Sequence, residues 1–429
     1  MQNERRVLVS ALMKAEKSGY SNILLNSVLN ESNLDPVKNS FVTTVFYGVL
    51  ERKIFIDFVL DKYLKKPIKK ASPFIAAVLR SGAYQILFME KVPKFAAVDE
   101  AVKITKKSKE NANSGLINAV LRKLCNENLE ILFSCAEPSV RFSVLSWMYK
   151  RLVADYGIEK TENFLEDSLL PPPIFVKINT LKANADEILK GFKTKGILLT
   201  KTEIENSFRA EGIRSIENLK EYKDGLFYVQ DFSSTVCATA LLAQKGMRVL
   251  DACAAPGGKT FTTAILMENE GEIVAGDIHD HRVKLILDGA KRLGLNIVSA
   301  KKMDATEFYE DLGQFDRVLC DVPCSGVGVI RRKPEIKYKF EQEVNELPDI
   351  QFKILENSAK YLKKGGRLIY STCTLLKSEN EEVVNRFLEN NKDFVPAPIG
   401  VMGISDTNVT FIPPEFLGDG FFIAAFERK

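Results

Sequence analysis

The sequence predicts a multidomain protein: an all-α helical bundle, a small α+β connector, and an α/β domain with a mostly parallel, doubly wound sheet. Three observations support this prediction. Apolar residues repeat at helical spacing in the first third of the chain, a triple proline interrupts the helices, and short apolar runs then alternate with helical stretches. The 429 residues are enough for about two to three domains, whose boundaries we place at 1–138, 139–232 and 233–429.

The front of the chain is predicted to be a helical bundle. Apolar residues recur at three- and four-residue spacing, as in Phe41, Val42, Val45, Phe46, Val49 and Leu50. Ser72 and Pro73 indicate another helix start, because a serine side chain caps free amides and proline fits the first turn. The fixed φ angles of Pro171, Pro172 and Pro173 then stop any helix and introduce the connector.

The remaining elements follow from short apolar runs. In the connector we expect strands at 175–179 and 197–200 around a helix at 185–192. Further along, strands are expected at 248–251, 273–277, 297–301, 317–321 and 367–372, with helical stretches between them. This alternation predicts a doubly wound parallel sheet, which binds its ligands at the carboxyl ends of the strands.

The composition predicts a globular, cytoplasmic protein. Apolar residues make up 45% of the chain and charged residues 27%, no apolar run is long enough to span a bilayer, and the polar start lacks the apolar core of a signal peptide. Seven scattered cysteines without a Cys-x2-Cys pair argue against disulfides and against a metal site. The oligomeric state stays open, with a monomer as the default expectation.

The basic charge is concentrated at the front of the chain. Residues 1–130 contain 21 Lys and Arg against 13 Asp and Glu, a net +8, whereas the remainder has a net charge of −4. Two lysine clusters contribute: Lys62, Lys65, Lys66, Lys69 and Lys70, and Lys103, Lys106, Lys107 and Lys109. The excess suits a polyanion such as RNA, but lysine-rich solvated helix faces fit it equally well, so both interpretations stay open.

A ligand-binding turn is predicted after the strand at 248–251. The run ACAAPGGKT, residues 252–260, consists of small residues and leads into a helix start, whose free N–H groups favour a carboxylate or phosphate. A phosphate loop would need glycine in place of Cys253, which disfavours an NTPase. The missing Gly-x-Gly-x-x-Gly pattern likewise disfavours a nicotinamide-dependent oxidoreductase.

Four carboxylates end or follow successive strands: Asp251, Asp277, Asp304 and Asp321. Any one of them alone would be an ordinary turn or helix cap. Four together favour a nucleoside-binding edge, at which Asp277 stands where an acid commonly binds ribose hydroxyls. Because acids discourage a polyphosphate, S-adenosylmethionine with its cationic sulfur and amino group fits better than NAD.

Two cysteines, Cys324 and Cys373, follow strands that we expect to be neighbours. The other five are by default small buried side chains. The two histidines, His279 and His281, lie in one apparent loop, and a hydrolase would have to use one of them. Paired thiols beside a methyl-donor pocket suggest methylation of cytosine at carbon 5, because thiolate addition at carbon 6 makes carbon 5 nucleophilic.

The motifs that carry this chemistry resemble a known family. Five motifs resemble the RNA (cytosine-5)-methyltransferases: QDFSS, DACAAPGGKT, DVPCSGVGVIRRKPEIK, STCTLLKSEN and GDGFF. Four motifs nearer the front resemble the NusB-like helical RNA-binding domain: FYGVLERK, LRSGAYQIL, AVDEAVKI and LINAVLRKL. Together they resemble the RsmB type over nearly the whole chain. The resemblance implies a Rossmann-like class I methyltransferase that uses S-adenosyl-L-methionine and acts on 16S rRNA.

The resemblance also implies roles for single residues. Cys373 would be the nucleophile, and Cys324 would assist product release. The donor would be bound by Cys253, Ala254, Ala255, Pro256, Gly257, Gly258 and Lys259, together with Asp277, Asp304 and Asp321. Arg331, Arg332 and Lys333 are candidates for contacts with RNA phosphates. Two departures from the family pattern, at Lys377 and at Met303, concern loop shape rather than a catalytic group.

The target cytosine must be single-stranded or flipped out, because a pocket thiol cannot reach a base inside a duplex. The main hypothesis is therefore an enzyme that methylates such a cytosine in 16S rRNA. A transfer RNA cytosine-5 methyltransferase and a non-catalytic RNA-binding or antitermination factor are the alternatives. The paired thiols discriminate between the classes, because a pure RNA binder has no use for Cys373 at that edge.

Overall fold

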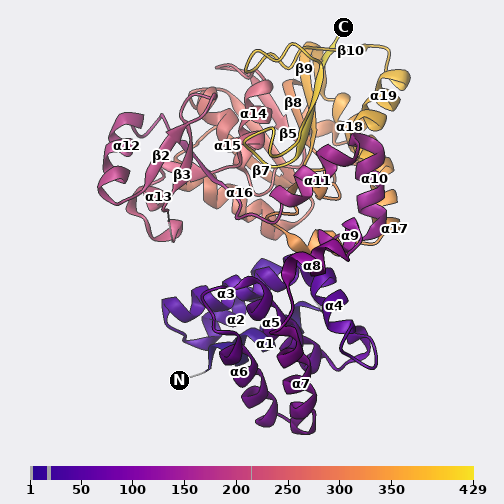
Figure 1. Cartoon of the computed structure of the whole chain (residues 1–429). Helices are drawn as coiled ribbons and strands as arrows, with labels where there is room; N and C mark the ends of the chain where they lie inside the picture. Colours follow the sequence, from indigo (N-terminus) through magenta and orange to yellow (C-terminus); the bar gives the residue numbers. More distant parts are fainter. Residues whose placement is uncertain (1–2, 17–20, 214) are drawn as a thin grey trace. The chain divides into compact units, whose positions relative to one another are not determined.

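The structure is a computed structural model that describes residues 3–16, 21–213 and 215–429. The chain forms two compact units, drawn in Figure 1. The helical unit comprises Met1–Leu169 together with Ile330–Lys339, which we call the inserted segment. The sheet unit comprises Leu170–Val329 and Phe340–Lys429. The finer division of the chain at residues 138 and 232 stays a prediction.

The helical unit confirms the predicted bundle. Its helices are α1 (Glu4–Ala15), α2 (Ser21–Ser32), α3 (Pro36–Glu51), α4 (Lys53–Asp61), α5 (Pro73–Phe88), α6 (Lys94–Lys106), α7 (Ser114–Leu124), α8 (Leu129–Ser134), α9 (Pro138–Arg141), α10 (Ser146–Tyr156) and α11 (Ile158–Asp167). The predicted start of α5 is confirmed, since the Ser72 hydroxyl accepts a hydrogen bond from the Ile75 amide at 3.3 Å. Val42, Val45 and Phe46 of the predicted apolar stripe are fully buried in the core.

The inserted segment is anchored within the helical unit by buried polar contacts. Its Lys337 side chain is fully buried, and Nζ lies 3.4 Å from the carbonyl oxygens of both Glu51 and Phe142. The indole N–H of Trp147 donates to the carbonyl of Lys339 at 3.0 Å. The chain therefore leaves the sheet unit after Val329, packs as part of the helical unit, and returns at Phe340.

The smaller sheet of the sheet unit contains the strands predicted for the connector. It consists of β1 (Ile174–Ile178), β2 (Leu198–Lys201), β3 (Ser207–Glu211) and β4 (Phe227–Val229), in the order β2-β3-β1-β4 with every pair antiparallel. The helices α12 (Ala185–Thr194) and α13 (Lys220–Lys223) belong to the same region. The expected strand–helix–strand sequence is thus confirmed within one or two residues at each end.

The larger sheet has a parallel centre and an antiparallel edge. Its strands are β5 (Arg248–Asp251), β6 (Glu272–Asp277), β7 (Val298–Lys302), β8 (Phe315–Asp321), β9 (Leu362–Thr372), β10 (Phe394–Pro396), β11 (Asn408–Phe411) and β12 (Phe421–Arg428). The order is β10-β12-β9-β8-β5-β6-β7, and β11 also pairs with β12. All five predicted strands are present and mutually parallel, whereas β10, β11 and β12 add antiparallel pairs.

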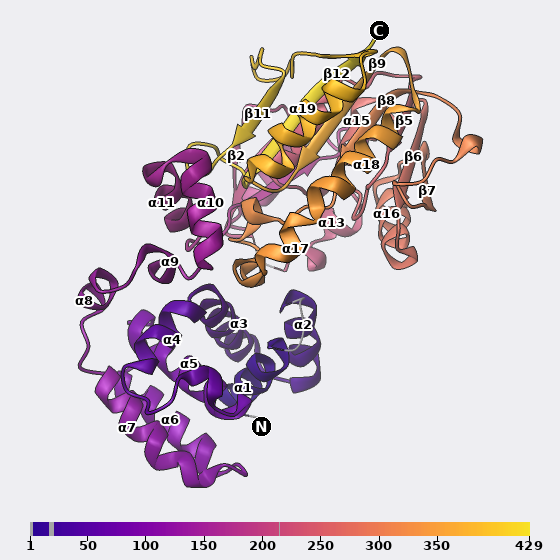
Figure 2. The ribbon, with the colours of Figure 1, turned by 90° about the vertical axis from the view of Figure 1, so that its right-hand side faces the viewer.

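Helices cover both faces of this sheet, which confirms the doubly wound architecture. The first face carries α14 (Phe232–Ala240), α15 (Gly258–Leu266) and α16 (Asp280–Leu293), and the second carries α18 (Leu347–Ala359) and α19 (Glu381–Asn390), preceded by α17 (Glu341–Asn345). Figure 2 shows α18 and α19 side by side across their face. Val249 packs toward the first face and Leu250 toward the second, because successive strand side chains alternate.

Neither a membrane-spanning helix nor a cluster of metal-ligating side chains is found among the described residues. Among the helices of this part of the chain, none is both long and apolar enough to cross a bilayer. Within the same residues, His, Cys, Asp and Glu side chains form no group of three or more that is placed to hold a metal ion.

Candidate active site

The predicted ligand turn lies between β5 and α15 at the carboxyl edge of the sheet. Gly257, with φ of 108°, caps α15, and a Cβ at this position would lie 2.4 Å from the Phe261 ring. Only glycine therefore fits this close turn. A cavity of about 210 Å³ opens beside it, lined by Val229, Gln230, Asp231, Ser234, Asp251, Cys253, Ala254, Ala255, Pro256, Gly258, Lys259 and Asp321.

The cavity brings together most of the predicted donor-binding residues. Six positions of the turn and Asp321 line it, as does Asp251. Asp277 and Asp304 lie at and after the next two strands along the edge, outside its lining. Gly257 shapes the turn without lining the cavity.

Besides Val229 at the end of β4, three lining residues were missed by the strand-end pattern. Gln230, Asp231 and Ser234 come from the junction of β4 and α14, before the first strand of the parallel sheet. Their only signal in the sequence is the QDFSS motif, because nothing in local periodicity shows that this junction folds back over the turn. Asp231 has a local role as well, since its Oδ1 accepts from the amide of Ser233 at 2.9 Å.

Lys259 and Asp321 form an ion pair across the cavity. Lys259 Nζ lies 2.6 Å from Asp321 Oδ2, and the side chains are 11% and 29% exposed. Burial opposes the charge of Lys259, but the neighbouring acidic groups, with Asp321 the largest among them, together outweigh burial and raise the pKa of the lysine above its ordinary value. Ser371 Oγ donates to the other oxygen of Asp321 at 2.8 Å. This carboxylate is thus fixed where the turn and the paired cysteines meet.

The remaining carboxylates differ in their surroundings. Burial raises the pKa of Asp251 to about 7, although Thr260 donates to its Oδ2 at 2.6 Å. Asp277 is 7% exposed, and its Oδ1 accepts from the His279 amide at 2.9 Å. Asp304 Oδ1 accepts from the amide and hydroxyl of Thr306 at 2.9 and 2.8 Å, which is the ordinary contact of a turn aspartate.

The two predicted cysteines are neighbours. Cys324 Sγ and Cys373 Sγ lie 3.0 Å apart, and the Cys373 amide donates to Cys324 Sγ at 3.3 Å. They meet because β8 and β9 are adjacent parallel strands in which Asp321 pairs with Ser371. The adjacent Cys373 sulfur, and then burial, raise the pKa of Cys324 well above that of a free thiol.

A buried glutamate holds the two cysteine loops together. Glu379 is fully buried, and its Oε2 accepts from the Ser325 amide and from Gln351 Nε2, both at 2.8 Å. The same Gln351 amide also donates to the Pro323 carbonyl at 3.0 Å. Glu379 lies in the STCTLLKSEN motif, whereas Ser325 directly follows Cys324. The two motifs are therefore locked to each other through one carboxylate.

Two expectations are corrected by the structure. Arg331 is not exposed for an RNA phosphate, because its guanidinium forms an ion pair with Asp167 at 2.7 Å and its side chain is only 8% exposed. His281 does not lie in a loop, because α16 begins at Asp280, and Ile286, Ala290 and Leu293 bury one face of that helix. The rings of His279 and His281 stack on each other at a centroid distance of 5.4 Å.

The doubly wound sheet and the small-residue turn at its carboxyl edge are those of a Rossmann-like methyltransferase, here preceded in the sequence by a helical bundle. The chain belongs to the 16S rRNA methyltransferase RsmB/F family. The model of that family matches residues 238–427, the NusB family model matches 2–126, and a ferredoxin-like domain model of RsmF/B-like methyltransferases matches 146–214. The resemblance stated from the motifs is thereby confirmed.

Relatives of known name match along the whole chain. The "Probable ribosomal RNA small subunit methyltransferase B" of Bacillus subtilis is 36% identical over 99% of this chain and 98% of its own length. The "Ribosomal RNA small subunit methyltransferase B" of Escherichia coli is 31% identical over 100% of this chain and 99% of its own. A solved structure described as "Crystal Structure of PH0851" is 25% identical, covers 100% and 99% of the two chains, and has a TM-score of 0.84.

Proposed function

We propose that this chain transfers a methyl group from S-adenosyl-L-methionine to carbon 5 of a cytosine in 16S rRNA, through a covalent bond between Cys373 and carbon 6. The observation that carries the proposal is the 3.0 Å separation of the Cys324 and Cys373 sulfurs at the ends of adjacent parallel strands. Asp321, three residues before Cys324, lines the neighbouring cavity and so links the thiol pair to a pocket for the donor.

The reaction needs the Cys373 thiol because carbon 5 of cytosine is by itself a poor nucleophile. Addition of the Cys373 thiolate to carbon 6 forms a sulfur–carbon bond and moves the ring electron pair toward carbon 5. The donor supplies the methyl group as an electrophile bound to its sulfonium sulfur, and that sulfur keeps the electron pair of the broken bond and becomes a neutral thioether. After carbon 5 has taken the methyl group, it loses its proton to a base, the sulfur–carbon bond breaks, and Cys373 leaves as a thiolate.

The neighbours of Cys373 have separate roles in this reaction. The raised pKa of Cys324 keeps it a thiol, which donates a hydrogen bond to the Cys373 sulfur as that sulfur departs. Asp321 lies at the same carboxyl edge of the sheet, where Lys259 and Ser371 hold its carboxylate in place. Its proposed role is to accept a hydrogen bond from the amino group of the target cytosine. The 3.0 Å contact between the two sulfurs supports the role of Cys324, and the hydrogen bond of Asp321 to Ser371, two residues before Cys373, supports that of Asp321.

The cavity suits a cationic nucleoside donor. Asp251 and Asp321 line it and favour a sulfonium over a polyphosphate. The small side chains from Cys253 to Gly258 let the donor approach the backbone, and Asp277 and Asp304 continue the edge toward its ribose and base.

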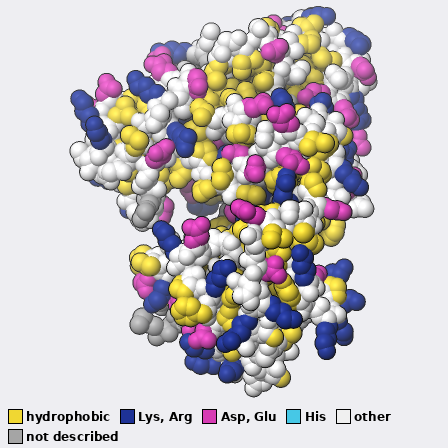
Figure 3. Space-filling model, in the orientation of Figure 1, with side chains coloured by type: hydrophobic (Ala, Val, Ile, Leu, Met, Phe, Trp, Pro, Cys, Tyr) yellow, Lys and Arg dark blue, Asp and Glu magenta, His cyan; other side chains and the backbone are white. Residues whose placement is uncertain are grey.

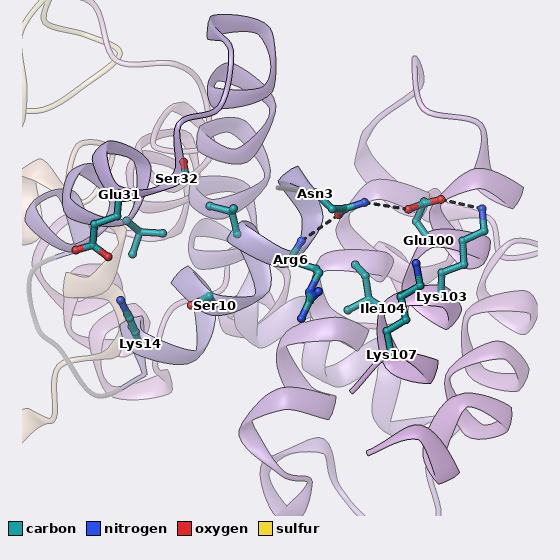
Figure 4. Close-up of a pocket in the computed structure, with 12 residues that line it drawn as sticks. Asn3, Arg6, Ser10, Lys14, Glu31, Ser32, Glu100, Lys103, Ile104 and Lys107 are labelled. Atoms are coloured by element: carbon teal, nitrogen blue, oxygen red, sulfur yellow. Dashed lines mark hydrogen bonds and ion pairs between the residues drawn. The ribbon is translucent and has the colours of Figure 1, made fainter. Parts of the chain in front are cut away.

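The RNA is proposed to bind on the helical unit, where Figure 3 shows many Lys and Arg side chains in that view. A groove of about 840 Å³ runs between α1, α2 and the end of α6. Arg6, Lys14, Lys103 and Lys107 line it, opposed by Glu31 and Glu100 (Figure 4). Lys103 donates to Glu100 at 2.9 Å, so Arg6, Lys14 and Lys107 are the better candidates for phosphate contacts.

Bisulfite mapping of ribosomal and transfer RNA tests the proposal. We expect one 16S rRNA cytosine to lose its 5-methyl group in cells that lack this chain, and to regain it with the wild-type gene but not with Cys373→Ala. Loss of a methyl group from transfer RNA instead would assign the other RNA class. Unchanged methylation of both RNAs would reject cytosine-5 transfer.

A further inference from the structure

The backbone of Cys373 is held on both sides. Its amide donates to Cys324 Sγ at 3.3 Å, and its carbonyl accepts a hydrogen bond from the amide of Gly328 at 3.0 Å. With the backbone fixed in this way, the position of the Cys373 sulfur depends only on rotation about the Cα–Cβ bond. Whatever holds Gly328 therefore also decides where the proposed nucleophile lies.

Gly328 is held by residues 418–420, which we call the GDG loop and which directly precede β12. The amide of Gly420 donates to the carbonyl of Gly328 at 3.0 Å. A Cβ on Gly328 would overlap the Gly420 carbonyl oxygen, and a Cβ on Gly420 would lie 2.7 Å from the Gly328 Cα. Neither glycine has a positive φ, so a side chain is excluded here by the close approach of two backbones and not by backbone conformation.

The GDG loop is in turn anchored to the start of α14. Ser233 is fully buried, and its Oγ donates to the carbonyl of Asp419 at 2.7 Å, while the amide of Asp419 donates to Asp231 Oδ1 at 3.2 Å. As the N-cap of α14, Asp231 also accepts from the Ser233 amide at 2.9 Å, which is the usual bond of a cap. The bonds with Asp419, 188 positions from Asp231, have no part in a cap and serve to hold the loop.

We propose that the GDG loop positions the nucleophile: Ser233 anchors the loop, and Gly420 sets the place of the Cys373 backbone through Gly328. This inference rests on the proposed function, because it takes Cys373 as the nucleophile. Ser233, Gly328 and Gly420 are not among the described residues that line the donor cavity. The loop should therefore affect the chemical step and leave the affinity for the methyl donor unchanged.

Two measurements on the full chain separate the chemical step from donor binding. Single-turnover methyl transfer to 16S rRNA, with the enzyme in excess and the donor saturating, gives the rate of the chemical step. Calorimetric titration with S-adenosylmethionine gives the Kd of the donor. The variants are Ser233→Ala, which removes the bond to Asp419 and keeps the backbone amide that binds the cap, and Gly420→Ala, which forces the loop away from Gly328.

Each variant has a matched control in the sheet unit. Thr239→Val removes another hydroxyl of α14, one that donates to the Thr235 carbonyl within the helix. Gly191→Ala adds a methyl group on α12 at a place where no described atom lies within 4 Å. Neither control touches the GDG loop, so both should keep the wild-type rate.

The expected result is a loss of rate without a loss of donor affinity. Gly420→Ala should lower the single-turnover rate by about a hundredfold, the effect of displacing a reacting group by about 1 Å, and Ser233→Ala by about tenfold, because it adds no clash. In both variants the Kd of S-adenosylmethionine should stay within about twofold of that of wild type. A merely structural role would lower rate and donor affinity together, because both depend on the same sheet edge.

The outcomes are distinguishable. A wild-type rate in Ser233→Ala or in folded Gly420→Ala overturns the inference, as does a rate that falls only in proportion to donor affinity. If Gly420→Ala does not fold, Ser233→Ala decides alone. If the wild-type chain transfers no methyl group to the RNA, or if Cys373→Ala still does, the proposed function fails instead.

Discussion

The sulfur atoms of Cys324 and Cys373 lie 3.0 Å apart although 49 residues separate them in the sequence. The contact depends on the register of two parallel strands and on one glutamate, Glu379, that binds the loop of the other motif. A distance this short means that the protonation of one thiol affects the other, as seen in the raised pKa of Cys324. The role of either cysteine is therefore best tested by comparing its single variant with the variant of the other cysteine and with the double variant.

Replacing the proposed nucleophile should stop catalysis and leave binding intact. We expect Cys373→Ala to lower methyl transfer by about four orders of magnitude or more, because the proposed bond to carbon 6 can no longer form. RNA affinity should stay within about twofold of wild type, since the thiol supplies no phosphate contact. Transfer of labelled methyl groups to 16S rRNA, with Cys135→Ala as the control at an exposed cysteine, measures the effect. Substantial turnover by Cys373→Ala would assign the nucleophile elsewhere.

The neighbouring cysteine should affect a later step. In Cys324→Ala the departing sulfur loses its hydrogen-bond donor, so the covalent intermediate should accumulate. We expect a band of RNA–protein adduct that survives denaturing electrophoresis, and we expect it to disappear in the double variant with Cys373→Ala. An adduct that persists in the double variant, or none in the single one, would contradict this division of roles.

Glu379 should stabilise both loops at once. Glu379→Ala leaves the Ser325 amide and the Gln351 side chain without this acceptor, which should lower the free energy of unfolding by about 3 kcal/mol and reduce kcat as the thiols lose their fixed spacing. Glu389→Ala is the matched control, because Glu389 is exposed on α19, and it should change stability by less than about 0.5 kcal/mol. Denaturant unfolding and kcat of both variants test this; equal effects would remove the proposed role.

Much of the fold could be predicted because it is encoded locally. The strands that end at Asp251, Asp277 and Asp321 are short apolar runs between helical stretches, and parallel strands bring such ends to one edge. The adjacency of the two cysteines follows from the same rule. Their 3.0 Å spacing does not, because it depends on side chains such as Glu379 that the strand pattern does not show.

The features that escaped prediction depend on contacts between distant parts of the chain. Nothing local shows that the inserted segment, which begins within the Cys324 motif, packs in the helical unit, nor that Gln230 reaches the turn before α15. The pairing of β12 with β9 was also missed, because an apolar run near the end of the chain does not show which strand it joins. Arg331 is wrongly predicted as a phosphate ligand for the same reason, because its partner Asp167 is 164 positions away in the sequence.

Charge in the groove of the helical unit should govern the salt dependence of RNA binding. Each phosphate contact contributes about −0.7 to the slope of log K against log salt for single-stranded RNA. Arg6→Ala with Lys107→Ala should therefore weaken binding at low salt and make the slope shallower by about 1 to 1.5. Lys364→Ala, an exposed lysine of the sheet unit, is the control. Filter-binding isotherms at several salt concentrations suffice, and identical slopes would exclude the groove.

Burial of Lys337 should make the stability of the helical unit depend on pH. Burial lowers the pKa of this lysine to about 7, from 10.5 in the unfolded chain, so between these values the unfolded state binds more protons. Stability should therefore rise with pH from about 7 to 10.5, by at most about 5 kcal/mol. Glu51, whose pKa burial raises to about 7, titrates below this window.

The single tryptophan provides the readout for this effect. Trp147 donates to the carbonyl of Lys339, two residues from Lys337, so its fluorescence reports on the inserted segment in the full chain. We expect the denaturant midpoint of wild type to rise between pH 7 and 10, and that of Lys337→Met to stay nearly flat because methionine fills the site without a charge. Lys339→Met, beside it, should keep the wild-type slope. A rise of equal size in Lys337→Met would show that other groups cause it.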